Sequence, residues 1–258
     1  MILFNRRFLS LVLSVAFVAS LAACADVPKD PQARAEFEAT NDPLEPANRV
    51  IFDVNDFLDR LLFKPIAGLY RVTIPPGIRD RLAHVLSNFK EPVVFANNLM
   101  QGEATDAGVT LGRLAVNSTV GVAGIWDVAT DWGMPQQNGD FGQTLYTWGV
   151  EASGPYVVLP IFGPSSVRDA LGLGADSVMS PWQYLASMNG VGTENRLNGF
   201  YFLASGTVQR EQNIESLDAL REGSLDFYAQ MRSVYRQYRD KQLGKQSTEG
   251  MPKFDDYE

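Results

Sequence analysis

The stretch that decides the fold is Asn41-Asp42-Pro43-Leu44-Glu45-Pro46-Ala47-Asn48-Arg49, together with the apolar and acidic residues that follow it. Asp42 stands three residues before Glu45, with Pro43 between them, which is the pattern of a capping box at a helix start. Beyond it, apolar side chains recur every three or four positions, the period of one helical face: Val50, Val54, Phe57, Leu58 and Leu61. Carboxylates such as Asp53 and Asp56 separate them. The stretch predicts an amphipathic helix, with these carboxylates on its solvated side.

The rest of the chain extends this helical pattern. With 258 residues, 45% of them apolar and 20% charged, the chain has the composition of a folded protein. Ser180-Pro181-Trp182-Gln183 repeats the capping pattern, and a further apolar stripe follows a last helix from Leu217 to Tyr238, opposite Arg232 and Arg239. The apolar run from Gly154 to Pro164 is too short to span a membrane, and its prolines argue against any regular element. These patterns predict a mainly α fold.

Composition excludes several classes of function. One cysteine and one histidine cannot form an internal disulfide or a structural zinc site, and we expect no metal and no cofactor. A net charge of −8 argues against a nucleic-acid partner, because such proteins present basic surfaces. His84 lies between Leu82 and Val85, as in a partly buried histidine with its hydrogen bonds satisfied. The chain also lacks the common nucleophile, phosphate-loop and dinucleotide motifs.

The amino terminus has the pattern of an exported lipoprotein. Arg6 and Arg7 precede a short apolar run from Phe8 to Val18, and Leu21-Ala22-Ala23-Cys24 matches the lipobox of a bacterial lipoprotein precursor. We therefore predict that residues 1–23 are a signal peptide and that Cys24 is lipidated. Ala25, rather than an aspartate, follows Cys24, which favours the outer membrane as the destination.

Composition also suggests the limits of the folded part. Residues 24–40 are polar and contain Pro28 and Pro31, as expected of a lipidated tether. Residues 244–258 are similarly polar and are expected to be a flexible tail. The segment between them, residues 41–243, is predicted to form one helical domain.

An ordered series of motifs begins at residues 41–49 and extends to Asp176. It continues through Asn88-Phe89-Lys90-Glu91-Pro92, Asn97-Asn98-Leu99-Met100-Gln101-Gly102, Arg113, Asn117-Ser118-Thr119-Val120-Gly121, Gly124-Ile125-Trp126-Asp127-Val128-Ala129, Asp140-Phe141-Gly142-Gln143-Thr144-Leu145, Trp148-Gly149-Val150, Gly154-Pro155-Tyr156, Leu159-Pro160, Gly163-Pro164-Ser165 and Arg168-Asp169. This series resembles the MlaA (VacJ) family of outer-membrane phospholipid-transport lipoproteins. The sequence departs from the family pattern at His84, Phe89, Tyr146 and Glu151-Ala152-Ser153.

The resemblance implies a ring, or doughnut, of amphipathic helices lying in the inner leaflet of the outer membrane, with a central amphipathic pore. It implies that the protein removes mislocalised phospholipids from the outer leaflet for retrograde transport and so maintains lipid asymmetry, without catalysing a reaction. The implied partners are phospholipid, a trimeric outer-membrane porin and a soluble periplasmic phospholipid carrier. The implied location is the periplasm-facing inner leaflet.

Within this resemblance, we assign the lipid path or gating loop to the region from Val120 to Leu145. Two glycines would give backbone freedom at the base of a short hairpin-like loop, and apolar side chains would face lipid. The residues assigned to this path are Gly121, Val122, Gly124, Ile125, Trp126, Phe141 and Leu145. Packing into the core is the alternative role for the same residues.

Two other functions remain open from the sequence. A structural lipoprotein could brace a porin or an assembly complex, and it would need the same anchor and helices. A cell-wall lyase is suggested only by Leu99-Met100-Gln101, and the Glu215-Ser216 pair that should precede this motif lies far downstream.

Overall fold

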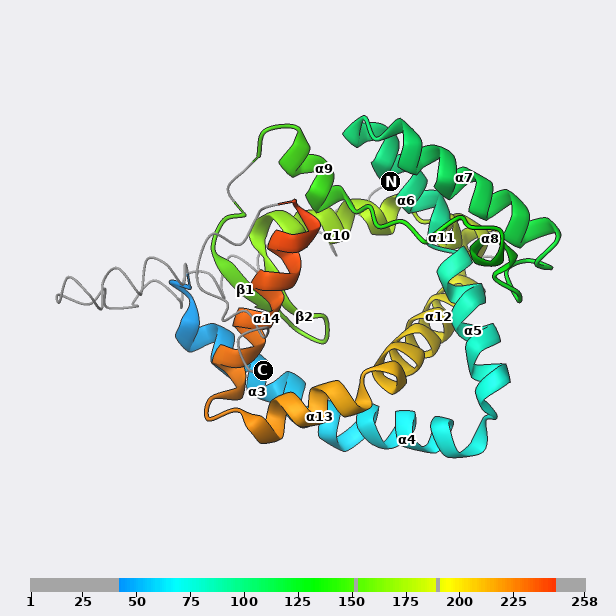
Figure 1. The fold of residues 1–258 in the computed structure, drawn as a ribbon. Coiled ribbons are helices and arrows are strands. Elements are labelled where there is room, and N and C mark those ends of the chain that lie inside the picture. Colours follow the sequence, from blue (N-terminus) through cyan, green and yellow to red (C-terminus); the bar gives the residue numbers. More distant parts are fainter. Residues whose placement is uncertain (1–41, 151–152, 189–190, 245–258) are drawn as a thin grey trace, which may run out of the picture.

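The computed structural model describes residues 42–150, 153–188 and 191–244, and helices dominate this part of the chain. Figure 1 shows the helices following one another around a ring, which the small sheet and the last helix complete on one side. The elements, in chain order, are α3 (Glu45–Leu58), the π-helix η1 (Asp59–Phe63), α4 (Lys64–Thr73), α5 (Pro76–Asn88), α6 (Glu91–Gln101), α7 (Ala104–Thr119), α8 (Val128–Asp131), α9 (Phe141–Thr147), β1 (Tyr156–Leu159), β2 (Gly163–Ser166), α10 (Val167–Met179), α11 (Pro181–Ser187), α12 (Val191–Gln212), α13 (Ile214–Gly223) and α14 (Phe227–Gln242).

The first described helix starts without the predicted capping box. Helix α3 begins at Glu45 with Pro46 in its first turn, and no side chain caps its amino end. The Asp42 carboxylate is buried instead, where it accepts hydrogen bonds from Asn48 Nδ2 (2.8 Å), Tyr228 Oη (2.5 Å) and Arg232 Nη1 (2.6 Å). The capping prediction was wrong because partners from α14 hold this carboxylate more strongly than a local amide would.

The two faces of α3 are oriented opposite to those of a typical soluble helix. Its regularly spaced apolar residues are exposed: Val50 by 64%, Val54 by 52% and Phe57 by 57%. The opposite face carries the buried Phe52 together with Asp56, whose carboxylate pairs with Arg221 from α13 at 2.6 Å. The prediction that Asp56 lies on a solvated face was therefore wrong, whereas Asp53 is exposed as expected.

The exposed apolar face continues beyond α3 around the ring. Helices α4 and α5 follow α3 along its lower and right-hand sides in Figure 1. The exposed apolar residues of η1, α4 and α5 are Leu61, Leu62, Ile66, Leu69, Val72, Ile78 and Leu82. We call these seven residues, together with Val50, Val54 and Phe57, the apolar belt. No helix in the described part of the chain has the length and hydrophobicity needed to cross a membrane.

The apolar run from Gly154 to Pro164 forms a β-hairpin, contrary to prediction. Strands β1 and β2 pair antiparallel, with Val158 opposite Pro164 and Tyr156 opposite Ser166. A two-stranded sheet has only edge strands, where a proline without an N–H group is tolerated.

Helix α3 holds this hairpin through two asparagines. The Asn48 side chain donates to Tyr156 O (3.0 Å) and accepts from Val158 N (2.9 Å), so its amide bonds as a neighbouring strand would. Asn55, seven residues later, bonds in the same way to Leu159 O (2.9 Å) and Ile161 N (2.8 Å).

The predicted last helix is two helices, α13 and α14, with a break between Gly223 and Phe227. Asp226 starts α14, since its carboxylate accepts a hydrogen bond from Ala229 N. Arg232 and Arg239 are not on a solvated face: Arg232 bonds to Asp42, and Arg239 bonds to Asp140 (2.5 Å) and Asp169 (2.8 Å). These ion pairs fasten the carboxyl-terminal helix to elements far away in the sequence.

Buried polar side chains hold much of the ring together. The main cluster of buried apolar residues is small and consists of Phe52, Tyr156, Val158 and Tyr228. By contrast, Asn97, Asn98, Arg113 and Thr144 are among the largest fully buried side chains. Several motifs that carried the family resemblance are therefore structural hydrogen-bonding groups.

Candidate functional site: a cavity with aromatic and charged walls

A cavity of about 640 Å³ lies among α3, η1, the β1–β2 turn, α10, α12 and α13. Its apolar wall includes Phe162 of the turn and Phe202 of α12, whose rings meet edge to face at 6.0 Å. Leu173 and Tyr201 also contribute to the lining. Elements from both ends of the chain therefore build one surface suited to hydrocarbon.

Another part of the same lining is charged. Arg210 binds Asp59 through Nε (2.6 Å) and Nη2 (3.1 Å), while Arg221 bridges Asp56 (2.6 Å) and Asp59 (3.1 Å). Arg210 Nη1 is buried and has no hydrogen-bond partner within the described chain. Because these charges are mostly paired, the wall is polar without a large net charge, and it can face a headgroup while the aromatic wall faces acyl chains.

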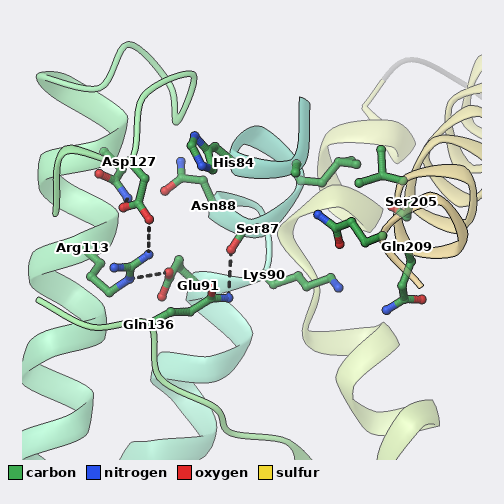
Figure 2. Close-up of a pocket in the computed structure, with 15 residues that line it drawn as sticks. His84, Ser87, Asn88, Lys90, Glu91, Arg113, Asp127, Gln136, Ser205 and Gln209 are labelled. Atoms are coloured by element: carbon green, nitrogen blue, oxygen red, sulfur yellow. Dashed lines mark hydrogen bonds and ion pairs between the residues drawn. The ribbon is translucent and has the colours of Figure 1, made fainter. Parts of the chain in front are cut away.

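A second, smaller cavity of about 260 Å³ lies between the α5–α6 junction, α7 and α12 (Figure 2). His84, Asn88, Glu91 and Asp127 are among the side chains that line it. Lys90, Ser205 and Gln209 line both cavities, so the two spaces adjoin at these residues.

Arg113 organises the wall of the smaller cavity on the α7 side, as the dashed lines in Figure 2 show. It is 2% exposed, and its guanidinium binds Glu91 Oε1 (2.9 Å) and Asp127 Oδ2 (3.2 Å). It also donates to Thr130 Oγ1 (2.9 Å) and Met134 O (2.6 Å). One buried cation thus joins α6 and α7 to α8 and to the residues on either side of α8.

The two carboxylates beside Arg113 respond differently to their surroundings. Burial raises the pKa of Glu91, against the opposing effect of its hydrogen bond from Arg113. Burial also acts to raise the pKa of Asp127, but hydrogen bonds from Thr130 and Asn117 prevail and lower it to about 2. Asp127 is therefore a firmly ionised cap of α8, where it accepts from Thr130 N.

The predicted gating residues from Gly121 to Trp126 form one tight turn after α7. Backbone bonds close the turn, including Gly124 N to Asn117 O (2.7 Å) and Trp126 N to Gly121 O (3.0 Å). Val122 has a φ of 51°, a conformation that is costly for a β-branched residue. Val122 and Trp126 are exposed, whereas Ile125 is partly buried and both glycines are buried.

The glycines of this turn allow close approach of neighbouring atoms. A Cβ on Gly121 would lie 2.6 Å from Asn117 O and closer still to Trp126 O. Gly124 has a φ of 88°, and a Cβ there would lie 2.6 Å from Asn88 Cβ. The gating assignment suggests a test in which valine replaces either glycine. Such a valine would disturb the folded turn itself as well as any gating motion of the turn.

We expect Gly121→Ala to lower the free energy of unfolding by about 3 kcal/mol, because the added methyl group collides with backbone atoms that cannot move independently. Gly108→Ala is the matched control, since Gly108 lies in α7 with nothing within 4 Å of an added Cβ. That control should raise stability by about 0.5–1 kcal/mol. Denaturant unfolding of both variants measures the difference, and equal stabilities would contradict the described turn.

Phe141 and Leu145 lie on α9, apart from this turn. Helix α9 packs on α10 and α6, where both side chains are partly buried and Phe141 meets Trp148 edge to face at 5.8 Å. None of the seven residues assigned to the lipid path lines either of the two cavities described above. Their role in the path stays a prediction.

Sequence patterns missed most residues of the cavity walls. Phe162 and Phe202 are separated by 40 positions, and Arg210 meets Asp59 across 151 positions. The only local indication of these walls in the sequence was the position of Asp56 and Asp59, which lie on the face of α3 and η1 opposite the apolar residues. His84 was expected to be satisfied, but its buried Nδ1 has no partner within the described chain. Cys24 lies outside the described residues.

Comparisons with known proteins agree with this architecture. The sequence model of the family described as MlaA lipoprotein matches residues 40–242. The intermembrane phospholipid transport system lipoprotein MlaA of Escherichia coli (strain K12) is 32% identical over 224 residues, which cover 85% of this chain and 83% of that protein. The protein of the same name from Haemophilus influenzae is 32% identical over 207 residues, 76% of this chain and 77% of its own.

A solved structure gives the same result at the level of the fold. The structure is described as the structural basis for maintenance of bacterial outer membrane lipid asymmetry. One of its chains is 29% identical to this one. The two superpose with a TM-score of 0.67, covering 78% of this chain and 98% of that chain. The family match spans more than half of the sequence, and the chain therefore belongs to the MlaA lipoprotein family.

Proposed function

We propose that this protein is an outer-membrane lipoprotein that removes mislocalised phospholipids from the outer leaflet and passes them to a soluble periplasmic carrier. The transport would be retrograde and would maintain the lipid asymmetry of the outer membrane. The names of the relatives support intermembrane phospholipid transport. In this proposal the protein is a passive conduit and catalyses no reaction.

The observation that carries the proposal is the cavity with aromatic and charged walls, in a ring whose helices α3 to α5 carry an exposed apolar belt. A phospholipid that leaves a bilayer must keep two acyl chains away from water while its headgroup stays solvated. At roughly 0.8 kcal/mol per buried CH₂, exposing both chains would cost on the order of 20 kcal/mol. A passage lined by Phe162 and Phe202 on one side and by Arg210, Arg221, Asp56 and Asp59 on another lowers that barrier.

The apolar belt supports a position within the lipid, in the inner leaflet. Val72 is 86% exposed and Leu69 is 66% exposed, and the belt continues along α3, η1, α4 and α5. Exposed apolar surface of this extent marks a contact with membrane or protein. Lipidation of Cys24 would fasten the ring on the periplasmic side, and a trimeric porin could cover part of its outer surface.

Deletion of the gene tests the proposed function directly. Outer-leaflet phospholipid should increase, measured by its accessibility to an outer-membrane acyltransferase, and the wild-type gene should restore the normal level. A structural brace would leave outer-leaflet phospholipid unchanged on deletion. A cell-wall lyase would instead release muropeptides, in a way that depends on a single carboxylate.

Cysteine labelling tests the position of the belt. We expect Val72→Cys, in the intact outer membrane, to react with a water-soluble maleimide much more slowly than Gln237→Cys on α14. Hydrocarbon around a thiol raises its pKa, and each unit of that shift alone lowers the thiolate fraction about tenfold. The chain's only natural cysteine is Cys24, so the background is low. Equal labelling rates in the membrane would contradict the lipid-facing belt, and equal rates in urea serve as the control.

A further inference from the structure

The smaller cavity contains hydrogen-bond acceptors that no donor of the described chain satisfies. Glu91 is 2% exposed, and its Oε2 is buried without a partner although its Oε1 binds Arg113. Asn88 donates through Nδ2 to Ser118 Oγ (3.1 Å), but its Oδ1 is also buried without a partner. An unsatisfied buried acceptor costs free energy, most of all when it belongs to an ionised group.

The charges on the Arg113 side of this cavity favour a cation, while Lys90 supplies a second positive charge elsewhere in the lining. Glu91 and Asp127 are two carboxylates that share one guanidinium, that of Arg113, which also donates to Thr130 and Met134 O. This cluster therefore has one negative charge in excess. A ligand with a donor and a positive charge would satisfy Glu91 Oε2 and neutralise the excess.

Lys90 offers the opposite chemistry at the junction of the two cavities. Its ammonium makes no hydrogen bond or ion pair with the residues that the structure describes, and it lines both spaces together with Ser205 and Gln209. Protein atoms that exclude water from around this ammonium lower its pKa, although part of the side chain stays exposed. In Figure 2, Lys90 extends from the Glu91 side of the cavity toward Gln209. A bound anion would stabilise its charged form.

We propose that the Lys90–Glu91 junction is a headgroup site for a phospholipid with a primary amine. The headgroup ammonium would enter the smaller cavity and donate to Glu91 Oε2 and Asn88 Oδ1, and the phosphate would bind Lys90. The acyl chains would follow the aromatic wall of the larger cavity, beside Phe162 and Phe202. This site rests on the proposed transport function and adds a headgroup preference to it.

The chemistry of the junction discriminates between lipid classes. A glycerol headgroup provides hydroxyl donors but no positive charge, so it leaves the excess charge at Glu91 uncompensated. A quaternary ammonium is charged but has no N–H group to donate. A primary ammonium meets both requirements, whereas the phosphate that all these lipids share binds Lys90 without distinguishing among them.

Lipid analysis of the full-length lipidated protein tests the site. The protein is incubated with mixed vesicles of equal phosphatidylethanolamine and phosphatidylglycerol content and re-isolated, and its bound lipids are quantified by mass spectrometry. We expect phosphatidylethanolamine to be enriched on the wild-type protein. Glu91→Gln should lower the ratio of the two bound lipids about tenfold, because a hydrogen bond to a charged group is lost while Arg113 keeps an acceptor. Glu103→Gln, an exposed site outside both cavities, should not change the ratio.

Three further variants keep the test valid even if Glu91→Gln fails to fold. Asn88→Asp adds a negative charge to the smaller cavity and should raise the phosphatidylethanolamine ratio. Lys90→Met removes the phosphate contact, so it should lower the binding of both lipids and leave their ratio unchanged, whereas Lys90→Arg should retain binding.

The possible outcomes separate this site from the transport function. Lipid that binds the wild-type protein without enrichment, or a ratio that Glu91→Gln and Asn88→Asp leave unchanged, overturns the headgroup site and leaves transport standing. A ratio that both variants leave unchanged would mean that water, rather than a headgroup, occupies the smaller cavity. If neither lipid binds the wild-type protein, the proposed transport function fails as well.

Discussion

Replacement of Arg113 by alanine is expected to lower the free energy of unfolding by about 3–5 kcal/mol, the usual cost of removing one partner from a buried ion pair. The side chain is 2% exposed and binds Glu91 and Asp127. Without it, Glu91 is left as a buried charge with no cation, and Met134 O loses a donor at 2.6 Å. Denaturant unfolding of the purified protein measures this effect.

Arg60→Ala provides the control for the Arg113 experiment. Arg60 is 60% exposed and pairs with Asp56 at 2.6 Å, so its removal should change stability by at most about 1 kcal/mol. If the two alanine variants were equally stable, Arg113 would not be the buried organiser that the structure describes. Protonation of Glu91 at low pH cannot replace the guanidinium, because Thr130 and Met134 O would still lack their donor.

Filling the larger cavity should abolish transport without unfolding the protein. Gly206 lies in α12 and lines this cavity, and an added Cβ there would meet nothing within 4 Å. We expect Gly206→Trp to raise outer-leaflet phospholipid to the level of the gene deletion, because the indole would occupy the space between the aromatic and charged walls. Its free energy of unfolding should stay within about 1 kcal/mol of wild type, since replacing a helical glycine tends to be favourable.

Gly199→Trp is the matched control, because Gly199 lies in the same helix with equally open surroundings but outside both cavities. It should transport lipid normally. If Gly206→Trp also transported normally while folded, the cavity would not be the lipid path. The path would then have to be sought elsewhere, first at the turn from Gly121 to Trp126.

The local prediction that failed at Asp42 shows what a sequence window omits. Asp42 has the right spacing for an N-cap, yet its carboxylate binds Tyr228 and Arg232, which lie 186 and 190 positions away. Charge-assisted bonds inside the protein outweigh one bond to an exposed backbone amide. The prediction that the Gly154–Pro164 run forms no regular element was wrong for a related reason. Asn48 and Asn55 of α3 stabilise a hairpin that the prolines of the run disfavour.

The turn after α7 shows a different limit. The sequence singled out Gly121 and Gly124 for backbone freedom in a gating loop, and in the structure both are buried. It does not support freedom of the backbone as the reason at Gly121, where the need is space beside Trp126 O and Asn117 O. A glycine alone does not reveal whether flexibility or close approach is required.

The sequence by itself determined that the chain is mainly helical, that its helices are amphipathic, and that it belongs with the MlaA lipoproteins. Helical period and ordered motifs are local properties, so they can be recognised without coordinates. Only the tertiary structure decided which face of each helix points inward. Both faces of α3 satisfy the same periodicity, and the choice depends on Arg210 and Arg221, which pair with Asp59 and Asp56 across more than 150 positions. Those long-range pairs bury the charged face against α12 and α13 and leave the apolar face exposed.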